Sequence, residues 1–232
     1  MRRFFACGVL AVSLHIASLS AQQPTGWGDE LPPAPALPDT LLAIPRIDFP
    51  LVPPAPPLTR PPSPVRAIYV NAWSFGSRRF YDLVRLAERT EINAFVVDVK
   101  DDTGYLTYRS EVPTAIAIGA IGQPRARDVR ERLRVMRAHG IHPIARIVVA
   151  KDPLLASRKP GWSVRHVDGG LWHDRLDFAW VDAFNDSVWV YAAELAAEAV
   201  RVGFAEVQYD YVRFPDEPES RLASAVFAGR HP

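Results

Sequence analysis

The sequence has one cysteine, almost no net charge and no long apolar segment, and each of these features excludes a class of protein. Cys7 alone cannot form an internal disulfide or a cysteine-based zinc site. A formal net charge of +1 over 232 residues gives no long-range attraction to polyanions, so we expect no nucleic-acid partner. No apolar run reaches the ~20 residues of a membrane-spanning helix.

Several catalytic motifs are missing as well. The six histidines show no HExxH or similar spacing, so we expect no metal site. No glycine-rich phosphate loop follows the first predicted strand, and no cofactor is expected. There is also no GxSxG nucleophile elbow. Asp98, Asp101 and Asp102 together would be able to hold Mg²⁺ for phosphodiester chemistry, but carboxylates alone are a weak metal signal.

The N-terminus has the pattern of a secretory signal peptide. Arg2 and Arg3 precede an apolar run over residues 4–16, and small residues follow up to Ala21. We therefore expect residues 1–21 to be cleaved and the protein to be exported to the periplasm, the cell surface or the medium. A buried N-terminal helix is the alternative, but the run has no polar face.

Proline, in contrast, is abundant. The chain has 22 prolines, and 14 of them lie between Pro24 and Pro64. Dense proline removes backbone donors and favours polyproline II, so residues 22–65 are predicted to form a semi-rigid linker. Such a spacer would hold the domain that follows, residues 66–232, away from a membrane or wall, and we expect cell-wall proximity.

Residues 66–232 alternate apolar strands with amphipathic helices. Strands are predicted at 67–73, 93–100, 142–150 and 205–214, and helices after Ser77, at 126–139 and at 186–202. Asn185 is the expected N-cap of the last helix and Gly203 its stop. Near-continuous apolar strands followed by helices indicate a parallel sheet covered by helices. A (β/α)8 barrel and a doubly wound sheet both fit, and the missing glycine loop favours the barrel.

A few polar side chains recur on one phase of the two-residue alternation in these strands. In chain order they are Asn71 and Trp73, Asp98 and Lys100, Arg146, and Gln208 and Asp210. Most lie toward the C-terminal ends of the strands, where a barrel has its substrate-binding mouth. Buried charges are costly unless paired or solvated, so two interpretations remain. Asp98, Lys100, Arg146 and Asp210 either satisfy one another or form a catalytic site.

The segment YDYVRFPDE, residues 209–217, favours the catalytic site. Asp210 lies between Tyr209 and Tyr211, and Arg213 follows. An aspartate there can attack an anomeric carbon or stabilise its developing charge, while aromatic rings stack on sugar faces. Two loops after other strands add further charged groups, although aspartates in such segments are usually turn formers. These are Asp101 and Asp102 in KDDTG, and Lys151 and Asp152 in AKDP.

Five segments, ordered along residues 66–217, resemble a bacterial family of predicted glycoside hydrolase domains. They are RAIYVNAW, INAFVVDVKDDTG, ARIVVAKDPLLA, DGGLWHDR and VQYDYVRFPDE. The resemblance implies a (β/α)8 barrel of the TIM type related to retaining glycosidases, and a carbohydrate substrate. It also implies that the acid at the end of the fourth strand, here Asp210, is the nucleophile.

Only about the first four βα units of such a barrel are recognisable. A full barrel takes ~250 residues, and the residues after Pro215 hold at most a short helix. In related retaining barrels the general acid follows a later strand, so we expect a truncated chain. Asp98 is a substitute acid, but we expect the neighbouring Lys100 to lower its pKa and make it a poor one.

The leading hypothesis is therefore an exported glycoside hydrolase that acts on a polysaccharide or a cell-wall glycan, with Asp210 as the nucleophile. The residues expected to bind the substrate are Trp73, Asp98, Lys100, Arg146, Lys151, Asp152, Tyr209 and Arg213. Two alternatives remain open. One is a non-catalytic carbohydrate-binding or wall-binding module on a proline-rich spacer, and the other is an inactive fragment of a longer enzyme.

Overall fold

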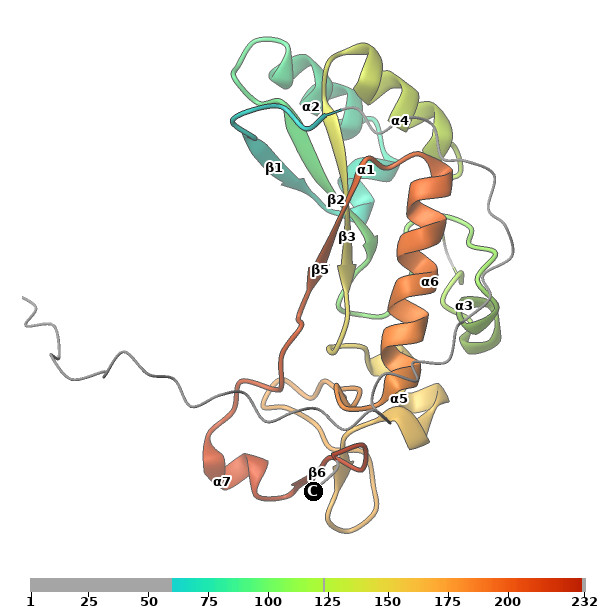
Figure 1. Cartoon of the computed structure of the whole chain (residues 1–232), viewed down its shortest axis with the longest axis vertical. Coiled ribbons are helices and arrows are strands. Elements are labelled where there is room, and N and C mark those ends of the chain that lie inside the picture. The colour runs from blue at the N-terminus through green and yellow to red at the C-terminus, as the bar shows by residue number, and fades with distance from the viewer. Residues whose placement is uncertain (1–59, 123, 231–232) are drawn as a thin grey trace, which may run out of the picture. The chain divides into compact units, whose positions relative to one another are not determined.

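The computed structural model describes residues 60–122 and 124–230 and contains the predicted parallel sheet (Figure 1). The expected signal peptide and most of the expected linker lie outside the described residues. Four strands pair in chain order, and every pair is parallel. They are β1 (Ala67–Val70), β2 (Ala94–Lys100), β3 (His142–Val148) and β5 (Glu206–Asp210).

Helices connect these strands, and a small second sheet follows the third. The helices are α1 (Ala72–Gly76), α2 (Arg79–Ala87), α3 (Pro113–Ile118), α4 (Val129–Ala138), α5 (Pro153–Arg158), α6 (Asp186–Val202) and α7 (Glu219–Leu222). A 3₁₀ turn, η2, covers Pro160–Trp162. The second sheet pairs β4 (Arg165–His166) with β6 (Ala225–Val226) in antiparallel fashion.

The order of the strands decides between the two architectures that fit the sequence. A doubly wound sheet reverses its strand order and carries helices on both faces. This sheet grows in one direction only, β1-β2-β3-β5, and right-handed crossovers then place all connecting helices on the same face. In Figure 1, α6 and α3 lie on one side of the strands. The fold is of the (β/α)8 barrel type, and the described residues supply its first four strands.

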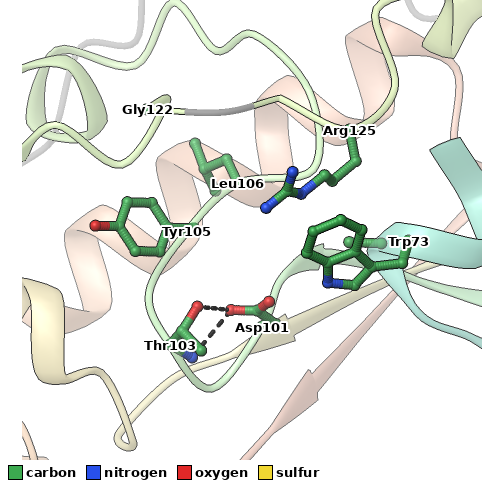
Figure 2. A pocket seen from close by; sticks show the side chains of 8 residues that line it. Trp73, Asp101, Thr103, Tyr105, Leu106, Gly122 and Arg125 are labelled. Carbon is green, nitrogen blue, oxygen red and sulfur yellow. Dashed lines mark hydrogen bonds between the residues drawn. The ribbon is translucent and has the colours of Figure 1, made fainter.

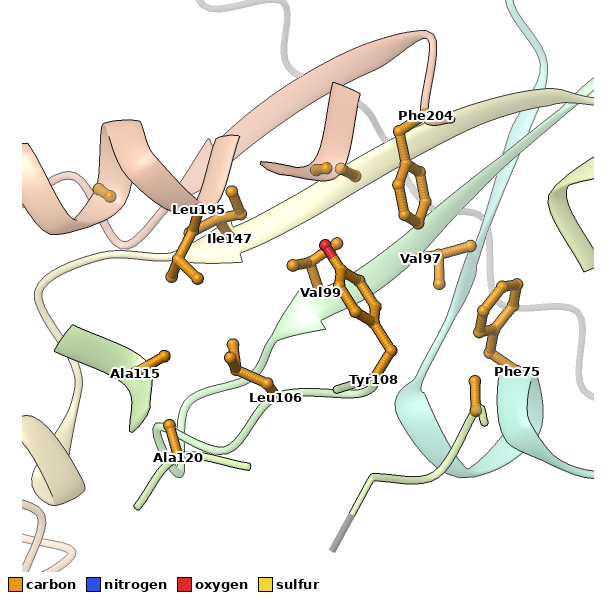
Figure 3. Close-up of a cluster of buried hydrophobic side chains, with 14 of the residues drawn as sticks. Phe75, Val97, Val99, Leu106, Tyr108, Ala115, Ala120, Ile147, Leu195 and Phe204 are labelled. Atoms are coloured by element: carbon orange, nitrogen blue, oxygen red, sulfur yellow. The ribbon is translucent and has the colours of Figure 1, made fainter. Parts of the chain in front are cut away.

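The side of the sheet that faces the helices forms the hydrophobic core. Val97 and Val99 of β2 and Ile147 of β3 are buried and cluster with Leu195 of α6 (Figure 3). Met136 of α4 belongs to the same cluster. The alternation of strand side chains sends polar groups to the other face. That face borders a hollow of about 500 Å³ lined by Tyr69, Val96, Arg146, Gln208 and Asp210, among others.

The first strand is shorter than the sequence predicts. It ends at Val70 because Asn71 caps the next helix, its side-chain oxygen accepting a hydrogen bond from the N–H of Ser74 at 2.8 Å. Trp73 therefore lies on α1, and the prediction that Asn71 and Trp73 project from a strand is wrong. β3 and β5 also end early, at Val148 and at Asp210.

The longest described helix is predicted correctly. α6 runs over Asp186–Val202, with the side chain of Asn185 accepting from the N–H of Ser187 and with Gly203 at a positive φ of 128°. α4 begins at Val129, three residues later than predicted. Within the described ranges, no helix is long and apolar enough to cross a membrane.

A buried arginine ties α4 to the end of α1. Arg132 donates from Nη1 to the carbonyl oxygens of Phe75 at 2.8 Å and Ser77 at 2.9 Å, and from Nε to Asp128 at 2.7 Å. The last carbonyls of a helix lack partners within the helix, so the guanidinium caps them. The short helix that carries Trp73 is thereby anchored to the body of the fold.

Candidate active site

Asp210 ends β5 at the C-terminal edge of the sheet, and its side chain is 39% exposed. Its Oδ2 accepts a hydrogen bond from Nε of Arg146 at 2.8 Å and forms an ion pair with Nη2 of the same guanidinium at 2.7 Å. Its Oδ1 accepts the N–H of Tyr211 at 2.6 Å. The carboxylate is thus held by both of its oxygens and remains open to solvent.

The backbone just after Asp210 is in an unfavourable conformation. Tyr211 has a φ of 54°, in the left-handed region that residues other than glycine rarely adopt. Such conformations persist only where the surrounding structure imposes them, and they gather at functional sites. Here the left-handed residue directly follows Asp210, so the chain bends away at the carboxylate.

Arg146 links Asp210 to a second carboxylate. Its Nη1 donates to Oδ1 of Asp98 at 2.6 Å, and Oδ2 of Asp98 accepts the hydroxyl of Tyr69 at 2.5 Å. Asp98 and Arg146 are register partners on β2 and β3, which explains their contact. A chain of polar contacts therefore crosses all four strands, from Tyr69 through Asp98 and Arg146 to Asp210.

The pKa values of the two carboxylates are shifted in opposite directions. Burial alone would raise the pKa of Asp210, but hydrogen bonds from Arg146 and Tyr211 outweigh it and hold the pKa below its ordinary value. Burial raises the pKa of Asp98 despite the hydrogen bonds from Tyr69 and Arg146. The expectation that Lys100 lowers the pKa of Asp98 is wrong, because Lys100 pairs elsewhere.

Lys100 and Asp152 form a closed ion pair. Nζ of Lys100 lies 2.6 Å from Oδ2 of Asp152, and the side chains are 2% and 0% exposed. Oδ1 of Asp152 also accepts the N–H of Leu155 and so caps α5. We expected both residues to bind substrate, but in this structure neither side chain reaches solvent. The predicted network of four charges is divided, with Lys100 belonging to a separate pair.

Lys151 and Arg213 lie near Tyr211. Nζ of Lys151 pairs with Asp102 at 2.9 Å, and both Lys151 and Arg213 line a cavity of about 120 Å³ that also borders Tyr211. Tyr209 is the register partner of Ile147, which faces the helices. Because in-register residues of parallel neighbours point to the same side, Tyr209 does not join the residues around Asp210.

Trp73 lines a larger cavity, of about 470 Å³, at the ends of β1 and β2 (Figure 2). The guanidinium carbon of Arg125 lies 3.5 Å from the centroid of its ring. Sequence reasoning missed Arg125, since a loop residue carries no periodic signal. It also missed Tyr69, although Tyr69 shares the alternation phase of Asn71 in the first predicted strand.

Arg146 limits what the two carboxylates can do together. Because its guanidinium lies between Asp98 and Asp210, the two carboxylates do not face each other across a free space. Asp210 can act as a nucleophile or as a stabiliser of positive charge, whereas Asp98 is not placed to protonate a group attacked by Asp210. Among the described residues, no three His, Cys, Asp or Glu side chains gather as a metal site.

The fold is that of a (β/α)8-type barrel, and a comparison of the sequence with protein families assigns a family to it. A family described as "Putative glycosyl hydrolase domain" matches residues 67–231. The chain belongs to this family. No curated protein matches the sequence significantly.

Solved structures resemble the chain to different degrees. A hypothetical protein from Ruminiclostridium thermocellum ATCC 27405 aligns with a TM-score of 0.62 and 45% identity, over 64% of this chain and 78% of that chain. Alpha-L-fucosidase isoenzyme 2 from Paenibacillus thiaminolyticus aligns at 0.47 and 16%, over 62% and 23%. The alpha-galactosidase TtGalA from Thermus thermophilus aligns at 0.43 and 20%, over 68% and 32%. The last two likenesses do not bear on the roles of individual residues.

Proposed function

We propose that this domain is a glycoside hydrolase that acts on a polysaccharide or a cell-wall glycan, with Asp210 as the nucleophile of a retaining reaction. The observation that carries the proposal is the solvent-open, hydrogen-bonded carboxylate of Asp210 at the C-terminal end of a barrel strand. A nucleophile must be deprotonated at working pH, and the lowered pKa of Asp210 meets that requirement.

The two oxygens of Asp210 have different tasks in this proposal. Oδ2 takes the hydrogen bond and the ion-pair contact from Arg146, which hold the carboxylate in place. Oδ1 accepts only the N–H of Tyr211 among the described residues, and it keeps lone-pair density for attack. Oδ1 forms a bond to the anomeric carbon while the glycosidic carbon–oxygen bond breaks, and the leaving oxygen takes a proton from a general acid.

The substrate contacts in this proposal come from residues at the rim of the sheet. Trp73 and Arg213 are exposed, Arg146 is half-buried, and Lys151 borders the small cavity beside Tyr211. Charged and aromatic side chains of this kind hydrogen-bond to sugar hydroxyls and stack on sugar rings. Lys100 and Asp152 are left out, because burial removes them from contact with a glycan.

Export is part of the proposal and rests on the sequence pattern of residues 1–21 and on the proline-rich residues 22–65. Expression in a bacterial host, followed by mass spectrometry of the protein from cytoplasm, periplasm and medium, tests it. Protein that begins near Gln22 and is found outside the cytoplasm is expected. Full-length protein confined to the cytoplasm would contradict export.

The nucleophile is best tested with aryl glycosides whose leaving groups need no protonation. The Asp210→Gly variant of the full chain is expected to lose turnover by about 10³-fold or more, since the covalent step is removed. Added azide should restore turnover by taking the place of the carboxylate and should give the glycosyl azide. Asp82→Asn is the matched control, because Asp82 is exposed on α2, pairs with Arg85 of the same helix and lines none of the cavities described here.

A non-catalytic carbohydrate-binding module is the second candidate. The placement of Arg146 between Asp98 and Asp210 favours it, because it leaves Asp210 without an acid partner in Asp98. Calorimetry with a glycan panel separates the two functions. If the wild type hydrolyses neither the glycans nor the aryl glycosides, and glycan binding survives Asp210→Ala, the protein is a binding module and the hydrolase proposal is contradicted.

A further inference from the structure

The cavity beside Trp73 has the make-up of a ligand site. Its volume of about 470 Å³ is within the range of small-molecule sites, and the two aromatic residues that border it, Trp73 and Tyr105, are 63% and 48% exposed (Figure 2). Large exposed aromatic side chains at a concave surface are a usual sign of binding. Asp101 and Arg125 supply its charged groups.

Arg125 is unusual among the arginines of the described chain. Arg132, Arg146 and Arg165 are the other arginines that are at least partly buried there, and each donates hydrogen bonds to carboxylates or carbonyls. Arg125 donates to none of the described residues, and instead its guanidinium carbon lies over the ring of Trp73, 3.5 Å from the ring centroid. Stacking of this kind leaves the N–H donors along the edge of the guanidinium, in the geometry that fits a carboxylate.

The backbone holds Arg125 in this position from two sides. A Cβ at Gly76 would lie 2.2 Å from the carbonyl oxygen of Arg125, so only glycine lets the end of α1 pack against this loop. The next residue, Ala126, donates its N–H to the carbonyl of Thr107 at 2.8 Å. Trp73 and Arg125 therefore come from segments that are packed together before any ligand arrives.

The other end of the cavity is acidic. Oδ1 of Asp101 accepts the N–H of Thr103 at 2.9 Å and also its hydroxyl, which fixes the side chain at the cavity wall (Figure 2). A carboxylate placed at this end would be repelled, whereas sugar hydroxyls can donate to Asp101. The two charges thus set one orientation for a ligand that has both an acid group and hydroxyls.

We infer that this cavity is a subsite for a carboxylated sugar, with the carboxylate paired to Arg125 and the hydroxyls directed to Asp101. The inference rests on the proposed function for the statement that the sugar is part of the glycan to be cleaved. The cavity lies at the same rim as Asp210, because Trp73 and Asp101 follow the C-terminal ends of β1 and β2, and Asp210 is the C-terminal residue of the parallel strand β5. A uronic acid unit of an acidic polysaccharide meets these requirements.

Calorimetry with uronic acid oligosaccharides tests the inference. The probes are oligomers of glucuronic, galacturonic and mannuronic acid, each paired with the same oligomer after its carboxyl groups have been reduced to alcohols. The full chain carries Asp210→Asn so that no probe is consumed. At least one acidic oligomer is expected to bind about ten-fold or more tightly than its reduced form.

Two arginine variants assign the effect to this cavity. Arg125→Gln should weaken binding of that acidic oligomer about ten-fold or more and leave the reduced oligomer unchanged. Arg127→Gln removes the same charge from an exposed side chain that does not line the cavity, and it should bind like the parent protein. Thermal melts confirm that both variants are folded.

The outcomes separate this inference from the proposed reaction. If no acidic oligomer binds more tightly than its reduced form, or if Arg125→Gln binds like Arg127→Gln, the inference is overturned, even where the wild type hydrolyses neutral glycans. If the acidic preference is present and depends on Arg125, the subsite stands. That result holds even where the wild type hydrolyses nothing and the proposed reaction has failed.

Discussion

Two groups of paired charges have members close together in the sequence of β2 and β3 and their loops, and they differ in whether a charged side chain remains accessible to solvent. Lys100 and Asp152 face only each other and the cap of α5. Arg146 binds Asp98 on one side and Asp210 on the other, and Asp210 is open to solvent. The first pair is closed to solvent and joins the end of β2 to the start of α5. The second group leaves one carboxylate, that of Asp210, accessible to solvent.

A local irregularity in the sheet produces this difference. Asp98 pairs in register with Arg146, but Lys100 pairs with Ile147, so β2 contains one residue more than β3 at this point. Such an irregularity redirects the side chain that follows it. Lys100 is register partner to a residue of the helix-facing core, and it reaches Asp152 rather than the polar face. Asp98 and Lys100, which the alternation pattern predicts on the same face of β2, therefore lie in different environments.

The largest expected loss of stability comes from breaking the ion pair of Lys100 and Asp152. Lys100→Met leaves the carboxylate of Asp152 buried without its cation, and the free energy of unfolding should fall by about 3–5 kcal/mol in urea titrations. The double variant Lys100→Met/Asp152→Leu should recover most of this loss, apart from about 1 kcal/mol for the missing cap of α5. A loss below about 1 kcal/mol in the single variant would contradict the closed-pair description.

An intermediate effect comes from the open group. Arg146→Gln leaves Asp98 with only the hydroxyl of Tyr69, but Asp98 can take up a proton, so the expected loss of stability is about 2 kcal/mol. Asp210 loses the hydrogen bond and the ion pair with Arg146, and its pKa should rise. The acid limb of the pH–rate profile on aryl glycosides should move to higher pH. An unmoved acid limb in a folded variant would show that Arg146 does not set the ionisation of the nucleophile.

The smallest expected effect is on the pH dependence of stability, which should have opposite signs for Asp210 and Asp98. The lowered pKa of Asp210 means that its stabilising contribution is present above the unfolded pKa and is lost as the pH falls through its folded pKa. The raised pKa of Asp98 means that its contribution is full below the unfolded pKa and is lost as the pH rises through its folded pKa.

Urea titrations at about pH 3 and about pH 7 measure this sign. The stability deficit of Asp210→Asn relative to wild type should widen as the pH rises, and that of Asp98→Asn should narrow. The change for Asp210→Asn should be about 1 kcal/mol or less, because the carboxylate of Asp210 is partly exposed to solvent. Deficits that change in the same direction for both variants would refute the opposite environments described for the two carboxylates.

Most of the fold could be predicted from the sequence, but only part of the candidate site could. Apolar strands followed by helices predict the parallel sheet, and the signals at Asn185 and Gly203 predict both ends of α6. The short helices α3 and α5 were missed because they are too brief to show a period. The separate fates of Asp98 and Lys100 depend on a register irregularity that the alternation pattern does not contain. The contact of Arg125 with Trp73 depends on the packing of a loop against the short helix α1, which the sequence pattern does not contain.

The capping of α1 by Arg132 has a consequence for the energetics at Trp73. Because the guanidinium holds the carbonyls of Phe75 and Ser77 from behind, the short helix has few conformations left to lose when a partner molecule arrives. Association there should carry only a small ordering entropy, as expected for a rigid platform. Removing the hydrogen bonds from Arg132, which leaves the exposed face of Trp73 unchanged, would make the same contacts entropically more costly.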